Sequence, residues 1–249
     1  MEAGAFYDQY WASGLHIGQE WSQQQFRKWL GPLAGRERVL DYGCGLGRSY
    51  QYWLTNSAKS YVGADVAELA LADLRRKGLS SLKIHPGTGA LDCPANSFDG
   101  ATCVEVFEHL FDPLAAAREI HRTLTPGGVL VATVPNFGYH AWRLLALLRA
   151  QVPLEPERPL ENRFKGVHIR FFSKLMLKRL LAAAGFSDIR ISSFGEASVW
   201  DAFLAAGHFA AIAFFARKHF PPFVRMTFLQ DVWPNVFAER LRAVARKPG

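Results

Sequence analysis

Two carboxylates and an imidazole stand within five residues of one another in Val104-Glu105-Val106-Phe107-Glu108-His109, and a second histidine, His168, follows much later in the chain. Carboxylate oxygens and imidazole nitrogens suit a hard or borderline divalent ion that keeps a position open for a substrate oxygen. Glu105, Glu108, His109 and His168 are therefore candidate metal ligands. Two alternatives use no metal: His168 acts as a general base, or it only helps to close a lid while Glu108 orients His109.

A glycine-rich turn, Gly43-Cys44-Gly45-Leu46-Gly47, follows the apolar run 38–42 and precedes a helical pattern near 48–56. Glycines let the backbone turn sharply and press against a bound nucleotide. Asp65 ends the next apolar run, where its carboxylate can accept hydrogen bonds from both ribose hydroxyls. Asp41, directly before the turn, would repel a phosphate and favour a cation. The pattern predicts an adenosine pocket with a positive group beside it.

Short apolar runs alternate with amphipathic stretches around these residues. We expect strands at 38–42, 60–64, 82–85, 100–106, 129–134, 188–194 and 240–245, and helices at 48–56, 66–77, from Asp112 and at 174–184. This alternation is typical of a parallel sheet covered on both faces, whose ligands bind at the carboxyl ends of the strands. The N-terminal segment 6–30, rich in aromatic residues, reads as a helical cap.

The run Val39-Leu40-Asp41-Tyr42-Gly43-Cys44-Gly45-Leu46-Gly47 resembles the first motif of the class I S-adenosylmethionine-dependent methyltransferases, whose cofactor carries a sulfonium and an ammonium. The resemblance continues through 61–65, 96–99, 124–128 and 184–186 in the family's order, and it covers roughly residues 36–194. It implies an α/β fold with a Rossmann-like, doubly wound, mostly parallel seven-stranded sheet whose last strand is antiparallel. It also implies S-adenosylmethionine as the cofactor.

The cofactor contacts that this resemblance implies come from the ends of several strands. They are Asp41, Gly43, Cys44, Gly45, Gly47, Asp65, Val66, Thr88, Gly89, Val104 and Glu105. The family often has Gly-Asp-Ala near the end of the third strand, with the aspartate on the adenine amino group, but this chain has Gly87-Thr88-Gly89-Ala90. Thr88, a backbone carbonyl or Asp92 would then take over the adenine contact.

The E-x-x-E-H element with a distant histidine is similar to that of small-RNA terminal ribose 2′-O-methyltransferases, where both glutamates and both histidines hold magnesium or manganese. It is also similar to the ubiquinone-biosynthesis O-methyltransferases. Methyl transfer is an in-line displacement in which positioning supplies much of the barrier reduction, and only an acidic acceptor needs a base. We expect His168 and His109 to be the catalytic residues, with Mg²⁺ or Mn²⁺ as a further cofactor if Glu105, Glu108, His109 and His168 converge.

We expect one methyltransferase domain over 1–249, with a helical N-terminal cap (1–35) and a cofactor-binding half (36–135). A lid insertion (136–170) and a C-terminal part (171–249) with an aromatic insertion (198–237) complete it. The formal charge of +7 belongs to the second half, because residues 1–135 hold 12 Lys+Arg against 14 Asp+Glu, and 136–249 hold 17 against 8. Such a basic face could meet RNA, anionic lipid or an acidic metabolite, or simply be solvated.

The aromatic residues of 198–237 cluster at core-like spacing, which suits a hydrophobic acceptor better than an RNA backbone. We therefore expect O-methylation of a small or lipid-like acceptor. The alternatives are a metal-assisted RNA ribose 2′-O-methyltransferase and a catalytically silent module that binds the cofactor. The apolar run 202–216 is shorter than the ~20 residues of a bilayer span. With three cysteines, an odd number, and no signal-peptide pattern, we expect a cytoplasmic protein, with peripheral membrane contact as an option.

Overall fold

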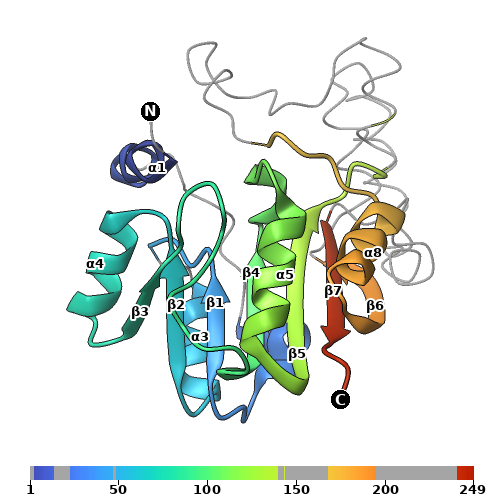
Figure 1. The fold of residues 1–249 in the computed structure, drawn as a ribbon, viewed down its shortest axis with the longest axis horizontal. Helices are drawn as coiled ribbons and strands as arrows, with labels where there is room; N and C mark the ends of the chain where they lie inside the picture. The colour runs from blue at the N-terminus through green and yellow to red at the C-terminus, as the bar shows by residue number, and fades with distance from the viewer. Residues whose placement is uncertain (1–2, 14–22, 47–48, 140–142, 144–167, 195–239) are drawn as a thin grey trace, which may run out of the picture.

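A seven-stranded sheet with helices on both faces forms the centre of the molecule (Figure 1). The computed structural model describes residues 3–13, 23–46, 49–139, 143, 168–194 and 240–249. The strand order is β3-β2-β1-β4-β5-β7-β6. The strands are β1 (Val39–Tyr42), β2 (Tyr61–Asp65), β3 (Ser80–Lys83), β4 (Phe98–Val104), β5 (Leu124–Pro135), β6 (Ser187–Phe194) and β7 (Arg240–Arg246).

Strand directions agree with the predicted fold class. The neighbouring pairs from β3 through β5 are parallel, and β7 is antiparallel to both β5 and β6. The predicted α/β, mostly parallel seven-stranded sheet with an antiparallel last strand is therefore confirmed. Its parallel strands end at one edge, which brings the ends of β1, β2 and β4 together.

Helices cover the two faces because successive strand residues point to opposite sides. Leu40 belongs to one buried cluster with Ile120 and Leu177, whereas Val39 belongs to the other with Trp53. In Figure 1, α5 and α8 lie in front of the sheet and α3 lies behind it. The helices are α1 (Ala3–Ala12), α2 (Gln23–Leu30), α3 (Ser49–Ser57), α4 (Glu68–Arg76), α5 (Pro113–Thr123) and α8 (Lys174–Ala183), with 3-10 turns η1 (Gly31–Leu33) and η2 (Phe107–His109).

Side-chain caps explain where two of these helices start. The Asp112 carboxylate accepts a hydrogen bond from the backbone of Ala115 at 2.9 Å, directly before Pro113 at the first position of α5. The Ser173 hydroxyl accepts one from Met176 at the start of α8. These caps set the first residues of α5 and α8, the two helices that lie in front of the sheet in Figure 1.

Several strand boundaries differ from the prediction. β5 begins at Leu124 and not at residue 129. The third strand covers Ser80–Lys83 and not 82–85, because Gly78, with φ +72°, ends the preceding turn early and lets the strand begin sooner. β4 ends at Val104 and not at Val106, because Glu105 takes a left-handed φ of +54° that no strand residue adopts. This bend redirects the chain into η2.

Parts of the predicted domain plan lie outside the described residues. They are most of the lid insertion 136–170, the aromatic insertion 198–237 and Gly47 of the glycine turn. The predicted N-terminal cap is represented by α1, α2 and η1. Within the described ranges, no helix is long and apolar enough to cross a bilayer.

Candidate cofactor and acceptor site

The glycine turn joins the end of β1 to the end of β2. The N–H groups of Gly43 and Cys44 both donate to the carbonyl of Ala64, at 2.8 and 3.0 Å. Gly43 has φ +77°, and a Cβ added there would lie 2.5 Å from Cγ2 of Val106. A side chain at this position would meet both a backbone penalty and a steric one. The turn therefore depends on glycine for the close approach of the η2 loop.

Asp65 stands at the carboxyl end of β2 and faces the glycine turn, as predicted. One carboxylate oxygen accepts a hydrogen bond from the N–H of Gly45 and the other from the N–H of Ala67, both at 2.8 Å. Burial raises the pKa of Asp65, and these two N–H groups oppose that shift. The side chain ties the turn to the start of α4, at the place where a ribose would be held.

Asp41 is fully buried below the same turn. Its Oδ2 accepts a hydrogen bond from the Tyr61 hydroxyl at 2.7 Å, and Tyr61 in turn accepts one from Gln51 at 2.9 Å. Among the described residues, Asp41 Oδ1 has no hydrogen-bond partner. Burial raises the Asp41 pKa to about 7, although the Tyr61 bond opposes this. An orphaned, buried carboxylate oxygen fits a cofactor that brings a positive charge.

The loop after β3 holds the residues expected near the adenine. Thr88 is exposed on this loop. The carbonyl of Gly89 accepts a hydrogen bond from the Tyr42 hydroxyl at 2.8 Å, which fixes the loop to the end of β1. Asp92 is paired with His85 at 2.8 Å and lies in solvent. The loop thus offers exposed polar groups to an adenine ring.

Three other predicted cofactor residues occupy strand ends. Cys44 follows β1 and is buried, Val66 follows β2, and Val104 is the last residue of β4. Burial raises the pKa of the Cys44 thiol well above its ordinary value, so this cysteine is a packing residue and not a reactive thiolate. All three line the edge of the sheet where the turn lies.

The predicted acceptor side begins at η2, which places Glu108 and His109 beyond the end of β4. His109 Nε2 lies 3.8 Å from Glu108 Oε1, and His168 Nε2 lies 4.0 Å from the same oxygen. The two imidazole rings are 4.9 Å apart between centroids. The Glu108 side chain is 1% exposed, whereas those of His109 and His168 are 20% and 31% exposed. The predicted convergence of these three residues is present, with the carboxylate inside and both rings reaching solvent.

Backbone hydrogen bonds hold the distant His168 segment in this place. The N–H groups of Ile169 and Arg170 both donate to the carbonyl of Glu108, at 2.9 and 3.0 Å. The Arg170 guanidinium also donates to the carbonyls of Leu110 and Phe111. The chain after His168 is therefore attached along η2, which explains how two histidines far apart in sequence form one site.

Glu105 does not join this cluster, which corrects the predicted set of four ligands. Its Oε2 lies 3.1 Å from Nε of Arg240, and its Oε1 accepts a hydrogen bond from the Thr133 hydroxyl at 3.0 Å. The described residues whose ligand atoms lie within 4.8 Å of one another here are Glu108, His109 and His168. The left-handed backbone at Glu105 directs its carboxylate toward β5 and β7, away from the histidines.

Arg240, Tyr61 and two aromatic residues of α1, Tyr7 and Trp11, were not predicted as part of the site. Burial raises the Tyr7 pKa to about 12, and the nearby carboxylates of Asp65 and then Glu108 add to the shift. The only sequence signal was the helical spacing of aromatic residues in this segment. Nothing local marks Arg240 as a partner of Glu105.

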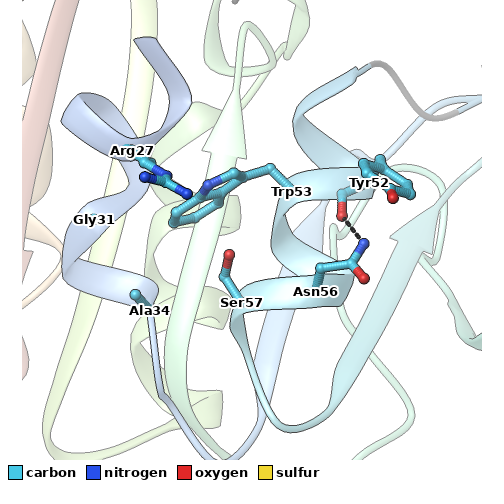
Figure 2. A pocket seen from close by; sticks show the side chains of 7 residues that line it. All are labelled: Arg27, Gly31, Ala34, Tyr52, Trp53, Asn56 and Ser57. Carbon is cyan, nitrogen blue, oxygen red and sulfur yellow. Dashed lines mark hydrogen bonds between the residues drawn. The ribbon is translucent and has the colours of Figure 1, made fainter. Parts of the chain in front are cut away.

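A separate pocket of about 510 Å³ lies between α2, η1 and α3 (Figure 2). Arg27 and Trp53 point toward each other across it, and Asn56 is bonded to the Tyr52 carbonyl at 2.6 Å. None of the glycine-turn or histidine residues lines it. It is therefore distinct from the site described above.

Sheet order, glycine turn and the two strand-end carboxylates together define the class I S-adenosylmethionine-dependent methyltransferase fold. A family model described as a methyltransferase domain matches residues 18–191, well over half of the chain. The chain belongs to this family.

Curated relatives agree with this assignment. A ubiquinone biosynthesis O-methyltransferase of Idiomarina loihiensis is 34% identical over 164 residues, which are 63% of this chain and 64% of the relative. One of Psychrobacter arcticus is 29% identical over 170 residues, covering 62% of this chain and 60% of the relative. The chain thus spans less than two thirds of the length of these relatives.

Solved structures share the fold at low identity. A S-adenosylmethionine-dependent methyltransferase of Thermotoga maritima matches with a TM-score of 0.57 and 15% identity, covering 98% of this chain and 99% of its own. The SpnF cyclase matches with a TM-score of 0.54 and 21% identity, covering 98% and 94%. A cyclase among these neighbours illustrates that this fold alone does not define the reaction.

Proposed function

We propose that this chain transfers a methyl group from S-adenosylmethionine to a hydroxyl oxygen of a small, lipid-like acceptor bound beside Glu108, His109 and His168. The observation that carries the proposal is the approach of two imidazole nitrogens to one buried carboxylate, at 3.8 and 4.0 Å. Val106 connects this group to the cofactor turn, because it packs on Gly43 immediately before η2. The names of the curated relatives support oxygen as the atom methylated.

The histidines supply the base that such a reaction needs. The acceptor hydroxyl gives its proton to Nε2 of His168 or His109, and its oxygen takes the methyl group as the bond from carbon to sulfur breaks. The sulfonium becomes a neutral thioether. Glu108, with its carboxylate beside both rings, stabilises the imidazolium that forms. The two rings reach solvent, so the proton has a route out.

The same three side chains also fit a divalent ion. Glu108, His109 and His168 would hold it through one carboxylate oxygen and two imidazole nitrogens. With Glu105 committed to Arg240, this donor set is richer in nitrogen than Mg²⁺ prefers, and it favours a more borderline ion such as Mn²⁺ or Zn²⁺. When bound, the ion would lower the pKa of the acceptor hydroxyl.

The surroundings of the histidines support an apolar acceptor. Phe111 is 85% exposed, and Phe137, Ile169 and Phe171 are also exposed around the same edge. The rings of Phe137 and Phe171 are 4.8 Å apart between centroids and form a continuous apolar surface. Exposed apolar groups of this kind are costly in water and are typical of a binding surface. An apolar tail on the acceptor, or the lipid layer that contains it, would cover them.

A methylation assay with labelled S-adenosylmethionine tests this proposal. The acceptors would be a simple phenol, the same phenol with a long alkyl tail, and an RNA with a free terminal ribose. We expect a methyl ether on the tailed phenol, and a loss of about 100-fold or more in His168→Ala, the range for removal of a general base. Lys178→Ala, which changes an exposed residue of α8 outside both the histidine cluster and the cofactor loops, is the control.

Three outcomes would decide against the proposal or a part of it. Methylation of the RNA and of neither phenol would overturn the acceptor class. Full activity of the wild-type enzyme in EDTA, with no gain from added Mn²⁺, would leave the histidines as a metal-free base. Methyl transfer to a ring carbon of the tailed phenol, and not to its oxygen, would overturn the proposed reaction itself.

A further inference from the structure

Helix α1 packs against the start of α4, close to the carboxyl end of β2. Figure 1 shows it above α4. The Asp8 carboxylate accepts a hydrogen bond from the N–H of Leu69 at 2.8 Å, in the first turn of α4. A Cβ added to Gly4 would lie 3.0 Å from the carbonyl oxygen of Val66. These contacts seat α1 directly beside the residues that follow Asp65.

The position of α1 places the indole ring of Trp11 against the glycine turn. A Cβ added to Gly45 would lie 2.6 Å from Cζ2 and 2.7 Å from Cη2 of Trp11. The N–H of Gly45 is bonded to the Asp65 carboxylate at 2.8 Å. The indole therefore lies at the backbone that faces the cofactor, next to the carboxylate expected to hold the ribose.

A row of aromatic rings continues from Trp11 toward the acceptor side. Trp11 packs edge-on against Tyr10 with centroids 5.2 Å apart, and Tyr10 packs on Tyr7 at 6.3 Å. Tyr7 is largely buried and lies near enough to Asp65 and Glu108 for both carboxylates to disfavour its ionisation. The row thus starts at the cofactor turn and runs along α1 to Tyr7.

We infer that Trp11, with Tyr7 beside it, recognises the positive charge of the cofactor sulfonium and so separates S-adenosylmethionine from S-adenosylhomocysteine. The electron-rich face of an aromatic ring attracts a cation, most strongly in tryptophan, and gains nothing comparable from a neutral thioether. Trp11 lies at the glycine turn beside the buried carboxylates of Asp41 and Asp65, so the methylated cofactor is retained and the demethylated product is released more easily. This inference depends on cofactor binding alone and not on the proposed acceptor.

Calorimetric titration of the full chain with each of the two ligands tests the inference. The quantity compared is the ratio of the Kd for S-adenosylhomocysteine to that for S-adenosylmethionine. Trp11→Leu should lower this ratio by between about 2-fold and 30-fold, the range for a cation–π contact. Trp11→Phe, which keeps a ring with a weaker quadrupole, should give an intermediate ratio. Tyr52→Leu, an exposed aromatic of α3, should keep the wild-type ratio.

Asp8→Ala provides a second comparison, because it removes the bond that seats α1 without changing a ring. Loosening α1 should move Trp11 away from the glycine turn, so Asp8→Ala should lower the same Kd ratio, by less than Trp11→Leu does. If Trp11→Leu and Trp11→Phe weaken both ligands equally, α1 is only a cover and the inference is overturned. An unchanged ratio in a folded Trp11→Leu protein overturns it as well. Wild-type protein that binds neither ligand would refute cofactor binding itself, a failure separate from that of the proposed acceptor.

Discussion

Binding of S-adenosylmethionine should expel a proton from Asp41. Burial holds the pKa of this carboxyl at about 7 in the free protein, and its Oδ1 has no hydrogen-bond partner among the described residues. A cationic cofactor placed beside it favours the ionised form and returns the pKa toward its ordinary range. The protein must therefore release whatever fraction of a proton Asp41 still carries at the pH of the experiment.

The magnitude follows from that pKa. At pH 7 Asp41 is about half protonated, so about half a proton leaves for each cofactor bound. Below pH 7 Asp41 is mostly protonated in the free protein, so cofactor binding must remove nearly a full proton. The Kd should therefore rise about tenfold between pH 8 and pH 6. The pH dependence of folding stability has the opposite sign. Between about pH 4 and pH 7 the folded, cofactor-free protein keeps the Asp41 proton, whereas the unfolded chain has lost it. The stability that Asp41 contributes is therefore lost as the pH rises from about 4 through 7.

Calorimetry in two buffers of different ionisation enthalpy, at pH 6, 7 and 8, measures the proton count directly. The cofactor's own ammonium also titrates in this range, so the Asp41 contribution is the difference between wild type and Asp41→Asn. Tyr61→Phe removes the hydrogen bond that favours the charged carboxylate and should move the pH dependence upward. Equal proton release from wild type and Asp41→Asn, with parallel pH profiles, would refute the reasoning.

Three further outcomes are expected. Gly43→Ala should weaken cofactor binding in calorimetry, and adding Val106→Ala should recover only the steric part, because φ stays at +77°; full recovery would contradict this. Glu105→Gly should be about 1 kcal/mol more stable to urea than Glu105→Ala, since φ is +54°; equal midpoints would count against it. Burial lowers the His121 pKa, so stability should fall as the pH drops below 6.5, and His121→Gln should reduce that fall in pH-dependent unfolding; parallel curves would exclude it.

Local patterns predicted the fold because each strand is a short apolar run followed by a strong turn or cap. Asp112-Pro113 marks a helix start in the sequence, and Asp112 acts as the cap in the structure. The predicted end of β4 was wrong because an apolar run does not reveal backbone strain. Val106 continues the apolar pattern, yet the left-handed conformation of Glu105 has already ended the strand.

The site was predictable where its parts are local. Asp41, the glycines and Asp65 follow from strand ends that must meet at one edge of a parallel sheet. The partner of Glu105 was not predictable, because Arg240 is 135 residues away and reaches it through the insertion of β7 between β5 and β6. Glu105 was predicted as a metal ligand from its spacing in the sequence, but in the folded protein its carboxylate is paired with Arg240.

Gly43 and Gly45 are contacted from opposite parts of the chain. Val106, from the loop that carries Glu108 and His109, packs on Gly43, whereas Trp11, from α1, packs on Gly45. Each close approach requires the absence of a Cβ, so the glycines serve these contacts as well as the cofactor. A change at either glycine therefore alters the acceptor loop or α1 together with cofactor binding. Loss of activity in a glycine variant is then not evidence for a cofactor contact unless the Val106 and Trp11 variants are measured beside it.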